Sequence, residues 1–233
     1  MPPPPTPPAP AASARTFYIV DKPGAAQTVV RIGHVGVARS TPDYYALQVM
    51  NTILGGSFTS RLNQNLRETH GYTYGAGSGY DMRRLAGPFS ARASVVTAKT
   101  DSSLFEFMKE LRGIRANPVG AEELEKAKAY LALGLPGQFE GTENAAGQFV
   151  DVLANDLPLD TWNKYIPGVR AVTAADVQRV AQQYIDPDHF VIVVVGDRQA
   201  IEPGIRALNE GPVSYRDLWG AELKPDTKSA SQR

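Results

Sequence analysis

The chain has 233 residues, and its 24 Lys and Arg side chains are balanced by 24 Asp and Glu. A formal net charge of zero argues against a general electrostatic affinity for nucleic acid or acidic membranes. Cysteine is absent, which excludes disulfides and thiolate metal sites, and no apolar run approaches the roughly 20 residues of a membrane span. The length and the 42% hydrophobic content predict one globular domain with a sizeable core.

The chain begins with a Pro/Ala tract at residues 1–14, which predicts a disordered, extended linker, because proline fixes φ and removes backbone donors. The tract lacks the basic and apolar regions of a secretion signal. We expect that Met1 begins a piece of a longer protein, that residues 15–223 form a single domain, and that residues 224–233 are a flexible tail.

The first elements predicted along the chain are two strands and a helix. Apolar and alternating residues predict strands at 17–20 and 27–37. A helix is expected at 42–54, with Pro42 in its first turn and Gly55-Gly56 ending it.

A helix and a strand follow within residues 55–80. Ser57 is the expected N-cap, and Phe58, Leu62 and Leu66 follow at intervals of four, so they are expected to stack on one helix face. Gly71 can take the positive φ that is common just after a helix end.

The strand expected at residues 72–80 alternates between tyrosine and glycine. Its period of two places Tyr72, Tyr74 and Tyr80 on one face. The opposite face leaves room for close packing of another backbone, because it carries three glycines, Gly75, Gly77 and Gly79.

The second half of the chain is mostly helical. A strand at 89–96 is expected to form a hairpin with the strand at 72–80, and the apolar run at 190–195 predicts a strand covered on both faces. Thr173 and Asp176 form a capping-box pattern that opens a helix. Other helices are expected at 101–116, 121–135, 142–155, 160–169 and from 198 to about Leu208. This order predicts an α+β fold with a mostly antiparallel mixed sheet packed against several helices.

Metal and nucleotide sites find little support in the sequence. His34, His70 and His189 lie far apart, and neither H-E-x-x-H nor H-x-x-E-H occurs, so no metal site is predicted in this chain. The strand glycines are spaced G-x-G-x-G after a helix, which does not match the dinucleotide fingerprint.

The segment LNQNLRETHGYTYG resembles the C-terminal, non-zinc-binding domain of the insulinase/pitrilysin/mitochondrial processing peptidase family of zinc peptidases. The resemblance extends from about Tyr18 to Asp197, because three further segments occur in the same order as in that family: KPGAAQ, PDYYALQVMNTILGG and IVVVGD. The resemblance implies that Arg67 and Tyr74, spaced as LR-x6-Y, donate hydrogen bonds to a substrate carbonyl. Tyr72 is the rival phenol and Arg61 the rival guanidinium.

The resemblance also implies partners and a mechanism. A separate domain or subunit would carry zinc on an H-x-x-E-H helix, and the two halves would enclose a peptide or unfolded protein, with Tyr72 and Tyr80 contributing to the cavity wall. The isolated chain would then be inactive. The alternative within the family is a zinc-less structural or assembly subunit. Resemblance also favours a periplasmic or otherwise exported protein.

Overall fold

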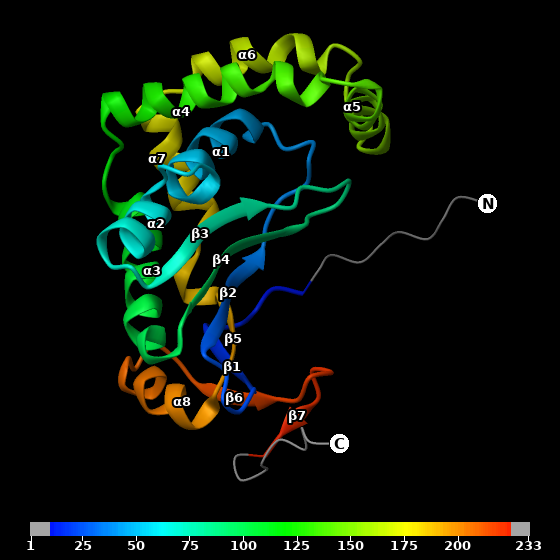
Figure 1. The fold of residues 1–233 in the computed structure, drawn as a ribbon. Helices are drawn as coiled ribbons and strands as arrows, with labels where there is room; N and C mark the ends of the chain where they lie inside the picture. Colours follow the sequence, from blue (N-terminus) through cyan, green and yellow to red (C-terminus); the bar gives the residue numbers. More distant parts are fainter. Residues whose placement is uncertain (1–9, 225–233) are drawn as a thin grey trace, which may run out of the picture.

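The computed structural model describes residues 10–224 (Figure 1). Most of the linker predicted at 1–14 and of the tail predicted at 224–233 lies outside the described residues. The described part contains a seven-stranded sheet in the order β3-β4-β2-β5-β1-β6-β7. Its strands are β1 (Thr16–Asp21), β2 (Gln27–Val35), β3 (Thr73–Tyr80), β4 (Pro88–Val96), β5 (Val191–Gly196), β6 (Val213–Arg216) and β7 (Glu222–Leu223).

Helices account for most of the remaining chain. The longer ones are α1 (Tyr44–Asn51), α3 (Thr100–Ala116), α4 (Ala121–Gly134), α5 (Thr142–Ala154), α6 (Thr161–Ala171), α7 (Ala174–Tyr184) and α8 (Arg198–Ala207). The shorter ones are η1 (Thr52–Gly56), α2 (Arg61–Asn63), η2 (Gln64–Thr69), η3 (Thr97–Lys99), η4 (Pro136–Phe139) and η5 (Pro187–His189). Between residues 10 and 224, no helix has both the length and the apolar character of a membrane span.

The sheet is mixed and mostly antiparallel. β2 pairs antiparallel with β4 and β5, β3 with β4, and β6 with β7, whereas β1 pairs parallel with β5 and β6. The β3–β4 hairpin and the α+β class are therefore confirmed. The strands β6 and β7 were not predicted, because β7 is only two residues long and β6 pairs with a strand almost 200 residues away in the sequence.

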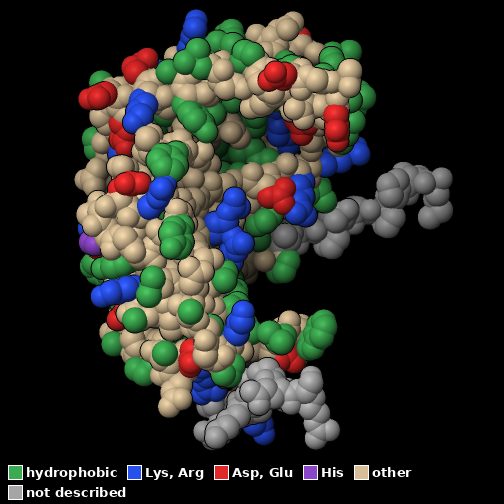
Figure 2. Space-filling view, viewed as in Figure 1, with side chains coloured by type: hydrophobic (Ala, Val, Ile, Leu, Met, Phe, Trp, Pro, Cys, Tyr) green, Lys and Arg blue, Asp and Glu red, His purple; other side chains and the backbone are tan. Residues whose placement is uncertain are grey.

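Helices cover one face of the sheet and leave the other face open (Figure 1). On β2 and β4, alternate residues such as Val30, Ile32 and Ala91 are fully buried toward the helices. The residues between them, including Arg31 and Arg92, are exposed on the open face. Figure 2 shows that this side of the molecule is hollowed between an upper arm, formed by α4 to α6, and the lower end that carries β7.

Strand β5 corrects one prediction. Ile192 and Val194 are fully buried, whereas Val191, Val193 and Val195 are only partly buried. The apolar run at 190–195 predicted cover on both faces, which is wrong, because the helices pack on one face only.

Two local predictions are confirmed. The Thr173 hydroxyl accepts a hydrogen bond from the Asp176 backbone N–H (3.1 Å), and the Asp176 carboxylate accepts one from the Thr173 N–H (3.0 Å), which completes the capping box. Gly71 has a φ of +63° just after η2. Both features depend on residues close in sequence, so the sequence alone was enough to predict them.

The outer edge of β3 is held by backbone and amide contacts from the helical segment before it. A Cβ on Gly55 would lie 2.3 Å from the Ser78 backbone nitrogen, so only glycine permits this approach. The Asn51 side chain donates to the Ser78 carbonyl (3.2 Å) and accepts from the Ser78 hydroxyl (2.8 Å). The buried Asn63 side chain accepts from the Ala76 N–H (3.1 Å). This confirms the prediction that a second backbone packs against the glycine-rich strand.

At the other end of the sheet, a carboxylate joins α8 to β6. Glu202 accepts hydrogen bonds from Arg198 and Arg206, both at 2.8 Å, and from the Tyr215 hydroxyl. Burial disfavours the charged form of Glu202, but these hydrogen bonds outweigh burial and lower its pKa from 4.5 to about 2.

We expect the acid sensitivity of the fold to depend on Glu202. Because its folded pKa is below its unfolded one, its contribution to stability is complete above about pH 4.5 and is lost as the pH falls toward 2. The variant Glu202→Gln should lose up to about 3 kcal/mol of stability at pH 7 and show a smaller decline on acidification. Thermal unfolding between pH 7 and pH 2 tests this, with exposed Glu143→Gln as control. Equal acid sensitivity of Glu202→Gln and the unmodified chain would contradict it.

We also expect Asn63 to stabilise the attachment of β3 to the helical segment. Asn63→Ala leaves the part-buried Ala76 N–H without its acceptor and the Phe58 carbonyl without its donor, which should cost about 1–3 kcal/mol. Urea unfolding measures the loss. The control is Asn144→Ala on the exposed surface of α5, expected to change stability by less than about 0.5 kcal/mol. Similar stabilities for the two variants would show that the bridge contributes little.

Candidate functional site

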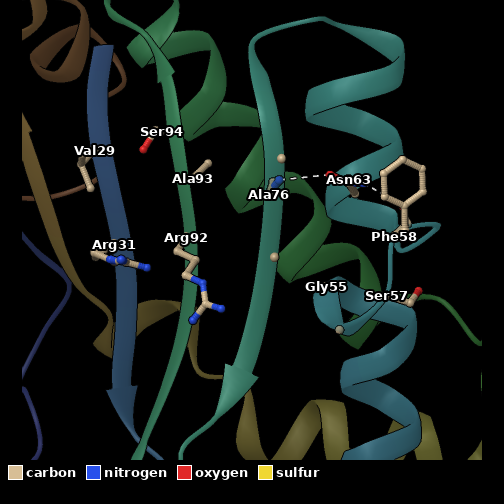
Figure 3. Close-up of a pocket in the computed structure, with 13 residues that line it drawn as sticks. Val29, Arg31, Gly55, Ser57, Phe58, Asn63, Ala76, Arg92, Ala93 and Ser94 are labelled. Carbon is tan, nitrogen blue, oxygen red and sulfur yellow. Dashed lines mark hydrogen bonds between the residues drawn. The ribbon is translucent and has the colours of Figure 1, made fainter. Parts of the chain in front are cut away.

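A groove of about 520 Å³ lies on the open side of the sheet, where β2, β4 and β3 meet the connection between η1 and α2 (Figure 3). It contains two arginines and no acidic residue. Its lining residues are Val29, Arg31, Gly55, Gly56, Ser57, Phe58, Asn63, Gly75, Ala76, Gly77, Arg92, Ala93 and Ser94. The expected Arg67 and Tyr74 are not lining residues, but both adjoin the groove through neighbours that are.

The chain reaches the groove by a route that differs from the prediction. The helical conformation continues past Gly55 to Gly56, and Ser57 is extended, with its hydroxyl donating back to the Thr52 carbonyl. The next helix begins after Ser60, which has the extended backbone of an N-cap. Ser57 is therefore not the N-cap, and Phe58 lies before the helix rather than on its apolar face.

Phe58 is consequently exposed (64%), whereas Leu62 and Leu66 are fully buried, so the predicted stacking of all three is wrong. Its position is fixed by Asn63, whose amide donates to the Phe58 carbonyl (2.6 Å) while its oxygen accepts from Ala76 of β3 (Figure 3). One buried side chain thus joins the two walls of the groove.

Arg67 lies on η2 beside this wall. Its guanidinium carbon is 4.4 Å from the centre of the Phe58 ring, and its Nε is 3.5 Å from the Glu68 carboxylate. An exposed cation over an aromatic ring gains about 0.5–1 kcal/mol, which orients the guanidinium without burying it. The Arg67 side chain keeps 35% of its surface exposed.

Tyr74 lies on β3, directly before the groove residue Gly75, and is 89% exposed. No hydrogen bond to its hydroxyl is recorded among residues 10–224. The structure therefore leaves a guanidinium and a phenol accessible, each next to a residue that lines the groove. It does not bury them apart in different layers of the fold.

The two rivals have other partners. Arg61 makes two short hydrogen bonds to Glu123 (2.7 and 2.6 Å), which raise the pKa of the Arg61 guanidinium. Tyr72 stacks on His70, with ring centres 4.9 Å apart, and packs against the core. Arg61 thus joins α2 to α4, and Tyr72 packs the start of β3 against the core.

Tyr80 is not on the same wall as Tyr74. Its ring packs on Phe89, 4.9 Å between centres, its hydroxyl is buried without a hydrogen-bond partner in the described structure, and burial raises its pKa. A bulge between Thr73 and Ala76 adds one residue, so the alternation of side chains changes between Tyr74 and Tyr80. The expected common face of the three tyrosines is therefore wrong.

The residues present do not fit a zinc site. Within residues 10–224, no group of three His, Asp or Glu side chains is placed to hold a metal ion. His34 lies between Phe89 and Phe190, with 5.4 Å to each ring centre, and burial lowers its pKa. His189 bonds to Asp186 (2.7 Å), on an exposed turn.

Sequence reasoning missed three features of the groove: the Asn63 bridge, the Phe58 platform under Arg67, and the pair Arg31 and Arg92 on the open face. The position of Asn63 in the first turn after Ser60 can be read from the sequence. Its hydrogen-bond partner Ala76 on β3 cannot, because that contact depends on tertiary packing. Pairing of the arginines depends on the register of β2 with β4.

Comparisons with known proteins identify relatives of this chain. An uncharacterized zinc protease of Mycobacterium leprae is 31% identical over 114 residues, which cover 49% of this chain and 26% of that protein. One of Mycobacterium tuberculosis is 24% identical over 79% of this chain and 42% of its own length. The chain thus spans less than half the length of these curated relatives.

Solved structures share the fold. A peptidase M16 inactive domain from Pseudomonas fluorescens superposes with a TM-score of 0.74 at 26% identity, over 80% of this chain and 45% of that one. An inactive peptidase domain from Bordetella parapertussis has a TM-score of 0.62 at 20% identity, over 73% of this chain and 93% of that one. A family model described as the peptidase M16 inactive domain matches residues 1–131. The chain therefore belongs to the peptidase M16 family and corresponds to its inactive domain.

Proposed function

We propose that this chain is the non-catalytic, substrate-binding half of a zinc metalloendopeptidase, in which Arg67 and Tyr74 donate hydrogen bonds to a carbonyl oxygen of an extended peptide. A partner domain or subunit with an H-x-x-E-H motif would supply the zinc chemistry. The observation that carries the proposal is the accessibility of both donors at one groove, with Tyr74 89% exposed and Arg67 oriented by Phe58.

The two donors suit a carbonyl that gains negative charge. A guanidinium has several N–H donors and no acceptor, and a phenol can donate one O–H. Donors fixed where an oxyanion develops stabilise the transition state more than the ground state. Here Phe58 restrains the Arg67 guanidinium, and the β3 backbone, anchored through Asn63, carries Tyr74.

The proposal includes two further elements that rest on family membership: a peptide or unfolded protein as substrate, and a periplasmic or otherwise exported location. Fractionation of cells that express the parent protein tests the location. The second family role, a zinc-less assembly subunit, would leave Arg67 and Tyr74 without a chemical task, so the kinetics below separate the two functions.

In the peptidase assembled from this chain and its H-x-x-E-H partner, Arg67→Ala or Tyr74→Phe should lower kcat by about 10²–10³. The reason is the loss of one oxyanion donor, and steady-state cleavage of a fluorogenic peptide measures it. Phe58→Ala should give a smaller loss, since the guanidinium remains but is no longer restrained.

Matched controls come from outside the groove. Tyr130→Phe removes an exposed phenol on α4, and Arg170→Ala removes an exposed guanidinium on α6. Both should cleave the peptide at the unmodified rate. If Arg67→Ala and Tyr74→Phe behave like these controls, the donor assignment is wrong and the assembly role gains support.

A further inference from the structure

Two arginines lie side by side on adjacent strands on the open side of the sheet. Arg31 of β2 is the direct cross-strand partner of Arg92 of β4, and both are exposed. Figure 3 shows their side chains leaving adjacent strands within the groove. Like charges directly opposite on neighbouring strands destabilise a sheet, so this pair carries an energetic cost in the unbound protein.

Within the described part of the chain, no carboxylate that pairs with either guanidinium offsets that cost. Most arginines between residues 10 and 224 form an ion pair with a carboxylate, but the side chains of Arg31 and Arg92 make no ion pair or hydrogen bond within this part of the chain. The groove that contains both has no acidic lining residue. It is therefore a positively charged surface in a chain whose formal net charge is zero.

The pair lies within reach of the proposed carbonyl donors. Arg92 is opposite Gly77 of β3, three residues after Tyr74, and the same groove is lined by Phe58, over which Arg67 lies. Three residues of extended chain span about 10 Å. A peptide whose carbonyl is bound by Arg67 and Tyr74 could thus place a group about three residues away at the arginines.

We propose that Arg31 and Arg92 form a subsite for a carboxylate of the bound peptide, about three residues from the carbonyl bound by Arg67 and Tyr74. The inference rests on the proposed function for the identity of the ligand as a peptide. Guanidinium groups bind carboxylates through paired, charge-assisted hydrogen bonds, and an incoming carboxylate relieves the repulsion between the two cations. The carboxylate is either an Asp or Glu side chain or the C-terminal carboxylate.

The test uses the chain itself and three N-acetylated tetrapeptides. One has four alanines and a free C-terminus, the second ends in glutamate amide, and the third has four alanines and a C-terminal amide. Titrations are followed by the Arg Nε–H signals in ¹H–¹⁵N NMR spectra, assigned with Arg31→Gln and Arg92→Gln. At least one of the two peptides that carry a carboxylate should shift the Arg31 and Arg92 signals saturably. Its affinity should be about tenfold above that of the amidated tetra-alanine peptide, which carries no charge. The response should weaken at high salt.

Three arginine variants show whether the preference for acidic peptides depends on the groove. Arg31→Gln and Arg92→Gln should each abolish the preference for the acidic peptides, whereas Arg170→Gln, at an exposed position on α6, should retain it. Both groove variants should melt no lower than the unmodified chain, because a like-charge contact is removed. A response to the free C-terminus alone identifies the C-terminal carboxylate, and a response to glutamate alone identifies an acidic side chain; either supports the subsite.

Equal or absent responses to all three peptides would overturn the subsite. This outcome is independent of the donor assignment, because the titration needs no partner domain and no turnover. Conversely, a carboxylate response at Arg31 and Arg92 in a protein whose Arg67→Ala variant keeps full turnover would refute the donor assignment and leave the subsite intact.

Discussion

The amide of Asn63 is the contact on which the groove depends. It binds the Phe58 carbonyl with its nitrogen and the Ala76 N–H with its oxygen, so it fixes the helical segment to the edge strand β3. An edge strand otherwise presents unpaired backbone groups that attract further strands. Here Asn63 and Asn51 occupy backbone groups of that edge, and Gly55 allows the two backbones to approach closely.

From this attachment the rest of the candidate site follows in order. Phe58 is fixed before α2 and lies under the Arg67 guanidinium, while β3 carries Tyr74 directly before the lining residue Gly75. The sheet beneath them leaves one face uncovered, and cross-strand pairing brings Arg31 and Arg92 together on it. The groove thus combines hydrogen-bond donors with positive charge and contains no acidic lining residue, a composition suited to carbonyl and carboxylate oxygens.

Local features of the fold were predictable from sequence, and non-local ones were not. The Thr173 capping box, the positive φ of Gly71 and the β3–β4 hairpin depend on neighbouring residues, and all are confirmed. The predicted face of Tyr80 is wrong, because a single-residue bulge that includes Gly75 changes the alternation, and three spaced glycines do not show which one marks the bulge. The Arg31–Arg92 pair depends on a register between strands some 60 residues apart, which periodicity does not determine.

The central claim is that this chain provides donors to the substrate while metal chemistry is located in a partner. A crystal structure of the assembled peptidase, with its partner inactivated and a peptide bound, tests this most directly. The account predicts one peptide carbonyl oxygen within about 3 Å of both the Arg67 guanidinium and the Tyr74 hydroxyl. A peptide bound elsewhere, with these two groups facing solvent, would contradict it.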